Sequence, residues 1–435
     1  MVRDIHPDEA IALVIATAVK VCPKPKTEKV GLDAALGRRL ARSYFSPIDH
    51  PPFTKASMDG FAFSSQAQEN AVNAGTPQGN VHRVTQIIAA GGPWPEPISG
   101  TDVARIMTGA PIPRGADAVQ RIEWTEEAGK DAQGRPLVRF MRQETARNVI
   151  GQGENLKSGQ LLLSPRVLMP QDIGILAAAG IAEPEVAVRP RVVVVSTGNE
   201  VVGVGEERTA AAIYDSNGPQ LRAQAQAFGC LAEYWGIVPD DRGLLATTLS
   251  RALGAADIVL ISGGVSMGDF DLVPAVLSDL GVEPVYHSIK MRPGKPSYLG
   301  VVGNTAVFAL PGNPVSTFVN FEILVKPYIR VMTGAQEGEG SLVVPCRLKK
   351  ALERTLCDRV EFWPAKLTIE THSASDAEIS ADSAKKEPTL CATPLEYGGS
   401  SMINILSEAN VLLRMEIGQT ELKSGEIVNA RLIRA

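Results

Sequence analysis

Cysteine and histidine are scarce in this chain of 435 residues, which contains five of each. The cysteines are scattered, and no two of them have the C-x-x-C spacing. An odd, scattered set argues against a disulfide framework and is typical of a reducing compartment, so we expect a cytoplasmic protein. Because thiol and imidazole ligands do not cluster, a structural zinc site is not expected, and any catalytic metal must be held by carboxylates.

The sequence also lacks long apolar runs and basic stretches. Its strongly apolar runs, such as residues 192–195, are far too short to cross a bilayer. Asp4, Asp8 and Glu9 stand where a signal peptide would carry its basic segment. The formal net charge is −5, and no segment is dominated by Lys and Arg. We therefore expect no membrane partner, no signal peptide and no nucleic-acid partner.

The chain is long, and it is rich in glycine and proline. At ~150 residues per domain, its length predicts about three domains with room for a smaller fourth. The 40 glycines and 30 prolines indicate many turns and shaped loops rather than long helices. We thus expect several soluble domains rich in loops.

The first 190 residues change their pattern twice. Residues 5–21 have apolar positions at helical spacing, and Pro7 fits the first turn of that helix. Between about 45 and 150 the pattern is one of short strands and turns, with a hairpin tip at residues 130–134. Residues 151–190 indicate connecting structure with one apolar helix near 170–180. We assign residues 1–45 and 150–189 to a linking N-terminal domain, and residues 46–149 to a β-rich domain.

The segment 190–333 alternates strands with helices. Residues 191–196 form a Val-rich strand of the kind that is buried on both faces of a parallel sheet. Further strands are expected at 232–238, 257–262 and 306–310, and helices at 218–228, 241–253, 272–280 and 315–331. This alternation predicts a doubly wound α/β domain, with its binding site at the carboxyl ends of the strands.

Short strands return in the last hundred residues. Residues 341–348, 360–369, 411–416 and 426–433 all have strand character, and the polar stretch 373–386 is expected to be a loop. The segment 340–435 is therefore predicted to be a C-terminal β domain, either a small barrel or a sandwich.

Three loops of the α/β domain combine glycine with small hydroxyl residues: STGNE at 196–200, SGGVSMGDFD at 262–271 and LPGNPVS at 310–316. Glycine allows backbone N–H groups to approach an anion closely. Turn chemistry alone explains any one loop equally well, but three loops at one sheet edge favour a phosphate-bearing ligand. None of them is a Walker loop or a GxGxxG fingerprint.

Charged residues near the same edge suggest how an anion would be held. Arg292 and Lys295, in the proline-flanked MRPGKP segment, could neutralise the oxygens of a phosphate or a similar oxyanion, although a solvated basic turn is the plainer alternative. Hard oxygen ligands for Mg²⁺ are also available there. Asp240 and Asp241 could equally be an N-cap pair for the next helix. The acidic candidates are Glu200, Asp240, Asp241, Asp269 and Asp271.

An ordered set of motifs runs along the whole chain: SMDGFA, RIMTGAP, STGNE, DSNGP, SGGVSMGDFD, MRPGKP and LPGNPVS. Together they resemble the molybdopterin molybdenumtransferase family, which includes the catalytic E-domain of gephyrin. The resemblance implies four domains and a homodimer whose site combines the α/β edge of one subunit with β-domain residues of the other. It implies adenylylated molybdopterin and molybdate as substrates, Mg²⁺ as cofactor, and molybdenum cofactor and AMP as products. Other proteins of molybdenum-cofactor biosynthesis are further possible partners.

The motif positions also imply individual site residues. Asp59 corresponds to the family's essential aspartate and Thr108 to its site threonine. The expected catalytic residues are Asp59, Thr108, Glu200, Asp240 and Asp271, of which Asp59, Glu200 and Asp271 would bind metal. The expected substrate-binding residues are Ser196, Thr197, Gly198, Ser262, Gly263, Gly264, Ser266, Asp269, Arg292, Lys295, Pro311, Gly312, Asn313, Pro314, Ser316, Arg359 and Ser400.

Two positions depart from the family pattern. Asn155 stands where an acidic residue is usual, and Ser288 stands where a lysine is often found. These departures leave the fold and the ligand class intact and bear on the rate or on the handling of molybdate.

The predicted reaction cleaves a phosphoanhydride and transfers molybdenum to the pterin dithiolene, with preorganised charge supplying most of the acceleration. Two alternative functions remain open on the sequence alone. A non-catalytic cofactor-binding scaffold of the same family is disfavoured by the intact Asp59 motif. A nucleotide pyrophosphatase built on the same α/β domain is disfavoured by the additional β domains.

Overall fold

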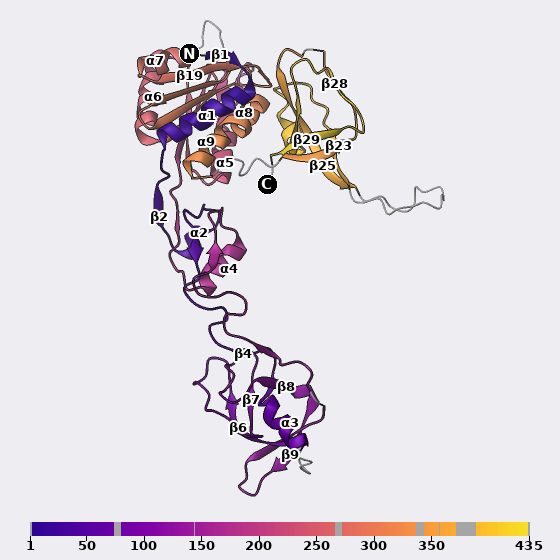
Figure 1. The fold of residues 1–435 in the computed structure, drawn as a ribbon. Helices are drawn as coiled ribbons and strands as arrows, with labels where there is room; N and C mark the ends of the chain where they lie inside the picture. The colour runs from indigo at the N-terminus through magenta and orange to yellow at the C-terminus, as the bar shows by residue number, and fades with distance from the viewer. Residues whose placement is uncertain are drawn as a thin grey trace, which may run out of the picture.

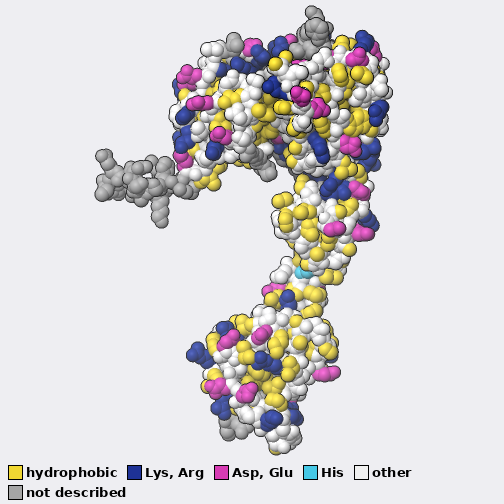
Figure 2. Space-filling model, turned by 180° about the vertical axis from the view of Figure 1, so that it is seen from behind, with side chains coloured by type: hydrophobic (Ala, Val, Ile, Leu, Met, Phe, Trp, Pro, Cys, Tyr) yellow, Lys and Arg dark blue, Asp and Glu magenta, His cyan; other side chains and the backbone are white. Residues whose placement is uncertain are grey.

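The chain folds into four units arranged as an elongated, bent molecule (Figure 1). The computed structural model describes residues 2–73, 80–142, 144–265, 272–335, 343–355, 357–370 and 389–433. The α/β domain and the C-terminal β domain lie side by side at one end, a small linking domain follows, and the β-rich domain forms the other end (Figure 1). The view from behind shows the same outline, with side chains of both charges interspersed on its surface (Figure 2).

The α/β domain is built on a mixed sheet with helices on both faces. The order of its strands is β1, β19, β21, β22, β18, β14, β17, and only β21 runs antiparallel to its two neighbours. The strands are β1 (Val2–Ile5), β14 (Arg191–Thr197), β17 (Leu231–Val238), β18 (Ile258–Ser262), β19 (Glu283–Ile289), β21 (Tyr298–Val302) and β22 (Thr305–Leu310).

Alternation along the central strands explains the two layers of helices. Val192 and Val194 of β14 belong to the core under one layer, and Val193 and Val195 belong to the core under the other. The first layer holds α1 (Pro7–Val21), α5 (Asn217–Ala227), α8 (Pro314–Asn320) and α9 (Lys326–Met332), with a π-helical turn at Phe321–Val325 between the last two. The second layer holds α6 (Arg242–Ala255) and α7 (Val273–Asp279). The predicted doubly wound fold is confirmed.

The first residues of the chain pack on the α/β domain, whereas we expected them in the linking domain. Strand β1 pairs in parallel with β19, and Ala10, Val14 and Ala18 of α1 are fully buried in the core of the α/β domain. Residues 2–21 therefore pack on the α/β domain rather than on the linking domain, because the apolar stripe of α1 covers this sheet.

The linking domain has a small core of its own, formed by residues such as Leu40, Leu168 and Leu176. Its chain enters and leaves through paired short strands. Its elements are β2 (Thr27–Lys29), α2 (Leu32–Ala35), β3 (Tyr44–Phe45), β12 (Leu161–Leu163), α4 (Pro170–Ala178) and β13 (Glu185–Ala187).

The β-rich domain contains a six-stranded sheet in the order β8, β5, β7, β6, β10, β9. The hairpin expected at residues 130–134 joins β9 to β10, whereas helix α3, none of whose residues is buried, was not anticipated. The elements are β4 (Lys55–Ala56), β5 (Gly60–Phe63), α3 (Ser65–Asn73), β6 (Val81–Ile88), β7 (Val103–Ile106), β8 (Ala118–Arg121), a 3₁₀ turn (Ile122–Trp124), β9 (Thr125–Lys130), β10 (Pro136–Phe140) and β11 (Val149–Ile150), which pairs with β4.

The C-terminal domain is a closed β-barrel, because β25 pairs with both β26 and β27 and the remaining strands complete the ring. A short strand of the α/β domain, β20 (Met291–Arg292), adds to β25 and joins the two domains. The elements are β23 (Val343–Leu348), β24 (Leu352–Glu353), β25 (Val360–Glu370), β26 (Thr389–Pro394), a 3₁₀ turn (Ile403–Ser407), β27 (Val411–Met415), β28 (Glu421–Leu422) and β29 (Ile427–Leu432). The polar stretch 373–386, expected to be a loop, lies outside the described residues.

Among the described helices, none has both the length and the apolar character needed to cross a membrane.

Candidate functional site

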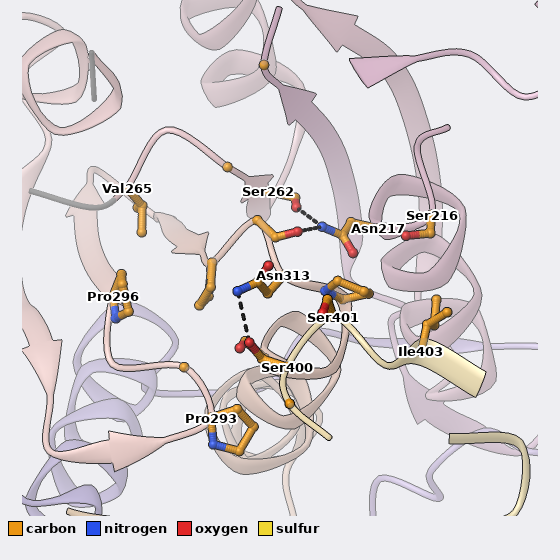
Figure 3. Close-up of a pocket in the computed structure, with 18 of the residues that line it drawn as sticks. Ser216, Asn217, Ser262, Val265, Pro293, Pro296, Asn313, Ser400, Ser401 and Ile403 are labelled. Atoms are coloured by element: carbon orange, nitrogen blue, oxygen red, sulfur yellow. Dashed lines mark hydrogen bonds between the residues drawn. The ribbon is translucent and has the colours of Figure 1, made fainter. Parts of the chain in front are cut away.

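A cavity of about 1060 Å³ opens where the α/β domain meets the C-terminal barrel. Three strands end together at its floor, since Ser262 of β18 is in register with Ser196 of β14 and with Leu310 of β22. The loops predicted to hold a ligand follow these strands, and Figure 3 shows several of their residues around the cavity. The predicted residues on its wall are Ser196, Thr197, Gly198, Glu200, Asp240, Ser262, Gly263, Gly264, Arg292, Lys295, Pro311, Gly312, Asn313, Pro314, Ser316, Arg359 and Ser400.

Close packing of two of these loops requires glycine. Gly263 has φ +93°, and a Cβ atom on it would lie 2.6 Å from the carbonyl oxygen of Thr197. Backbone of the second loop thus lies directly against the end of β14, which no residue with a side chain allows without strain. The glycines of the second loop therefore shape the cavity floor.

A buried polar network supports the floor, and it was not assigned a role from the sequence. Asp215 accepts hydrogen bonds from the Ser196 hydroxyl (2.7 Å), the Tyr234 hydroxyl and the backbone N–H groups of Asn217 and Gly218 (3.0 and 3.1 Å). Burial, followed by the hydrogen bond to Asp215, raises the pKa of Tyr234 well above its ordinary value, so this hydroxyl stays a donor. Asp215 thereby ties β14, β17 and the start of α5 together.

Asn217 bridges two of the ligand loops. Its Nδ2 donates to the Ser262 hydroxyl (2.8 Å) and to the carbonyl oxygen of Gly312 (2.6 Å), as Figure 3 shows. Its Oδ1 is buried and has no hydrogen-bond partner within the described ranges. The signal in the sequence was the DSNGP motif before α5, which the family resemblance included without a role for its members.

Both predicted cations line the cavity, and each is already paired with a carboxylate. Arg292 Nε lies 3.4 Å from Oε1 of Glu361, a buried residue of β25 that also pairs with Arg354. Lys295 Nζ lies 3.4 Å from Oδ1 of Asp4, which belongs to β1. The cavity thus combines positive charge with nearby counterions from distant parts of the chain.

The C-terminal barrel supplies the opposite wall. Asn313 Nδ2, in the third loop, donates to the Ser400 hydroxyl at 2.9 Å, and Val315 N donates to the Ser400 carbonyl oxygen. Two aromatic residues of this wall that were not predicted, Trp363 and Tyr397, pack edge to face with ring centroids 5.4 Å apart. Burial, together with the nearby Glu361 carboxylate, raises the pKa of Tyr397 to about 12.

The two adjacent aspartates after β17 have different positions. Asp241 is the N-cap of α6 and accepts a hydrogen bond from Leu244 N at 2.8 Å. Asp240 lines the cavity and is joined to Asn199 by reciprocal hydrogen bonds between backbone N–H groups and side-chain oxygens. Of the two, Asp240 is therefore the one available to a ligand.

Carboxylates are present at the cavity, but those that the structure describes do not form a complete metal cage. Glu200 is exposed on the wall and Asp240 is half-buried. Over the residues that the structure describes, no group of three or more His, Cys, Asp or Glu is placed to hold a metal ion. Three predicted site residues, Ser266, Asp269 and Asp271, lie outside the described residues.

Asp59 and Thr108 lie together, but in the β-rich domain at the far end of the chain from the cavity (Figure 1). They are on the turns that follow β4 and β7, respectively, and both are exposed. Asp59 Oδ1 accepts hydrogen bonds from the Thr108 N–H and from the Thr108 hydroxyl, each at 2.7 Å. The structure thus joins this pair to each other and not to the cavity of the same chain.

The two departures from the family pattern have different surroundings. Asn155 is exposed next to the linking domain, where its backbone N–H donates to the carbonyl oxygen of His50. Ser288 is buried at the end of β19, where its hydroxyl exchanges hydrogen bonds with Asp4. Neither residue is among those that line the cavity.

Comparison with known families divides the chain into three consecutive matches. Residues 5–180 match the model for the MoeA N-terminal region (domain I and II), residues 193–331 match a probable molybdopterin-binding domain, and residues 357–433 match the MoeA C-terminal region (domain IV). The matches follow one another in the order of the domains, although the first includes α1, which packs on the α/β domain, and the third begins after β24 of the barrel.

Relatives and solved structures match over almost the whole length. A protein from Staphylococcus aureus named molybdopterin molybdenumtransferase is 30% identical over 92% of this chain and 90% of its own. One of the same name from Staphylococcus epidermidis is 28% identical over 98% of this chain and 94% of its own. A molybdopterin biosynthesis MoeA protein from Pyrococcus horikoshii has a structure with TM-score 0.78 and 29% identity, covering 100% of both chains. These end-to-end matches show that the chain belongs to the molybdopterin molybdenumtransferase family of molybdenum-cofactor biosynthesis.

Proposed function

We propose that this protein inserts molybdate into adenylylated molybdopterin, releases AMP and forms molybdenum cofactor. One observation above all supports the proposal: a single large cavity joins three aligned glycine-rich loops, two cations and the Arg359 and Ser400 wall of the barrel. Such a cavity suits a long ligand with a phosphoanhydride and planar rings. A cofactor-binding scaffold is not favoured, because the curated relatives are named transferases.

In this proposal the floor binds the ligand and the cations orient it. Backbone N–H groups of the glycine-rich loops approach phosphate oxygens closely. Arg292 and Lys295 offset the charge of the phosphoanhydride and of molybdate, and Arg359 with Ser400 faces them from the barrel. Preorganised donors of this kind accelerate a reaction because they stabilise the charge that develops in the transition state.

Mg²⁺ is the proposed cofactor, and the donor set fits it. Glu200 and Asp240 offer hard oxygen ligands on the cavity wall. Mg²⁺ is ordinarily bound by one or two carboxylates, with substrate phosphates and water completing its shell. When bound, it would neutralise charge on the phosphate oxygens. Asp271, predicted as a further ligand, is the last residue of the second loop in the sequence.

A second copy of the chain would complete the site. Asp59 and Thr108 are far from the cavity of their own chain (Figure 1). We therefore propose a homodimer in which the β-rich domain of each subunit brings this pair to the cavity of the other. In such a two-fold assembly both sites are composite and equivalent. The proposed compartment is the cytoplasm, consistent with five free cysteines, and other proteins of the pathway are proposed partners.

Single-turnover assays with adenylylated molybdopterin test the function directly. AMP release should be stimulated strongly by molybdate and should decline when Mg²⁺ is removed. The Lys295→Ala protein serves as the control, since it keeps the glycine-rich loops but loses one cation. Binding of adenylylated molybdopterin without any molybdate-dependent release would favour the scaffold.

A further inference from the structure

The N-terminal strand brings a carboxylate to the loop that carries Lys295. Strand β1 runs parallel to β19, with Arg3 opposite His287 and Ile5 opposite Ile289. Between these pairs, Asp4 N donates to the Ser288 hydroxyl (3.0 Å), and that hydroxyl donates back to Asp4 Oδ1 (3.1 Å). The same Oδ1 lies 3.4 Å from Lys295 Nζ. A residue at the very start of the chain therefore pairs with a cation of the cavity.

Two residues at this contact have strained backbone conformations, which must be held by specific interactions. Asp4 has φ +50° and Ser288 has φ +72°, and both lie in the left-handed region that residues with side chains rarely adopt. Each such residue costs free energy unless its surroundings hold it there. The reciprocal hydrogen bonds between Asp4 and Ser288 provide that restraint. The position of the Asp4 carboxylate is thus determined by the fold.

Electrostatics keep Asp4 charged in this position. Burial raises the pKa of its carboxyl, but the hydrogen bond from Ser288 and the ion pair with Lys295 outweigh that effect and hold the pKa below its ordinary value. At neutral pH Asp4 is therefore a carboxylate, and it faces Lys295 in this form.

Arg292 and Lys295 differ in how firmly their counterions hold them. The partner of Arg292 is Glu361, whose side chain is 1% exposed and also pairs with Arg354. The side chains of Lys295 and Asp4, in contrast, are 48% and 46% exposed. Exposed ion pairs are weak because water screens them. Lys295 is consequently a cation of the cavity that can change partners.

We propose that Lys295 exchanges Asp4 for a tetrahedral oxyanion when a ligand enters the cavity, so that Asp4 lowers the affinity of the site for phosphate or molybdate. The idea rests on the proposed function, because it assumes that this cavity binds such an anion. The anion would have to displace Asp4 from an exposed ion pair worth about 0.4–1 kcal/mol. This corresponds to a loss of roughly two- to fivefold in the affinity for the anion. Asp4 would then help the protein to release its anionic product.

The test is a double-mutant cycle read by calorimetry, with AMP as one probe and molybdate alone as the other. Asp4→Asn should tighten binding of at least one probe by roughly two- to fivefold, and the probe that responds identifies the oxyanion. Lys295→Ala should weaken binding, and adding Asp4→Asn to Lys295→Ala should change nothing further. Glu283→Gln is the matched control, since it removes an exposed charge at the other end of β19.

Three results would overturn the proposal. Weaker binding by Asp4→Asn would mean that Asp4 holds Lys295 in its working position. Tightening that persists in the Lys295→Ala background, or that Glu283→Gln reproduces, would mean a general effect of charge. Unchanged binding would show that Asp4 and the anion do not compete. If the wild-type protein bound neither probe, the proposed function would fail together with this inference, whereas Lys295-dependent binding that ignores Asp4 would remove this inference alone.

Discussion

Asp59 accepts two hydrogen bonds on the same carboxylate oxygen, from the N–H and from the hydroxyl of Thr108, each at 2.7 Å. The backbone N–H makes the larger contribution and the hydroxyl the next in lowering the pKa of Asp59 below its ordinary value. The pair thus presents a fixed, ionised carboxylate on the surface of the β-rich domain. Such a group is suited to act on a ligand that another subunit holds.

Replacing Asp59 by Asn should impair reaction more than binding. The ligand is expected to be held by the glycine-rich loops and by Arg292 and Lys295, whose described residues make no contact with Asp59 of their own chain. We expect near-normal calorimetric binding of adenylylated molybdopterin, and a loss of roughly a hundredfold or more in molybdate-stimulated AMP release. Wild-type release by the folded variant would remove Asp59 from the mechanism.

Replacing Thr108 by Val should move the acid limb of the pH–rate profile. The hydroxyl bond stabilises the ionised carboxylate, so its loss raises the pKa of Asp59 toward the ordinary value. Because the proposal requires the ionised form, activity is lost as pH falls through this pKa, and the limb should shift to higher pH in kcat/KM. Thr108→Ser keeps the hydroxyl and should retain the wild-type limb. An unmoved limb in the Val variant would separate Thr108 from the titration.

The buried network around Asp215 should matter for stability. Its two carboxylate oxygens accept from two hydroxyls and two backbone N–H groups, and an amide has only one oxygen to offer. Asp215→Asn should therefore destabilise the α/β domain by about 1–3 kcal/mol, the cost of leaving buried polar groups unsatisfied. Thermal unfolding followed by calorimetry measures this loss of stability. Tyr234→Phe, which removes a single donor, should cost less, and the opposite order would contradict this description.

Substitution of Gly263 tests the packing of the cavity floor. An alanine there would place Cβ 2.6 Å from the Thr197 carbonyl oxygen at φ +93°. Gly263→Ala should lower both the melting temperature and the affinity for AMP, with a strain of about 1–3 kcal/mol. Gly254→Ala is the control: Gly254 is exposed in α6 with nothing within 4 Å of the added atom. That change should stabilise the helix by about 0.5–1 kcal/mol.

In the α/β sheet, strands β22, β18, β14 and β17 could be predicted from sequence, whereas β1, β19 and β21 on the other side of the sheet could not. Strand β14 is a run of Val that is buried on both faces, so its composition alone identifies it. Strand β1 has four residues, and β19 begins with Glu283 and Pro284, so only pairing with neighbours makes them strands. Helix α3 was missed for a related reason: none of its residues is buried, and Ala67, Ala71 and Val72 are its only apolar residues.

The loops of the site could be predicted from sequence, but the carboxylates that pair with its cations could not. Glycine and hydroxyl residues after a strand carry a local signal, and Gly263 is an example. The partners of Lys295 and Arg292 are Asp4 and Glu361, which lie in other domains or at the other end of the chain. Contacts over such separations leave no local pattern. In the buried network of Asp215, the hydrogen bonds from Ser196 and Tyr234 each span 19 residues, and only those from the N–H groups of Asn217 and Gly218 are local.

Mixing two inactive variants tests the central claim, that the site is shared between two subunits, most directly. Asp59→Asn subunits keep an intact cavity, and Lys295→Ala subunits keep an intact Asp59. Because a two-fold dimer has two equivalent sites, random pairing should leave one site of each mixed dimer intact and restore up to about a quarter of wild-type molybdate-dependent AMP release. Mixed dimers, verified by differential tags, that release no AMP above the level of either parent would contradict the account.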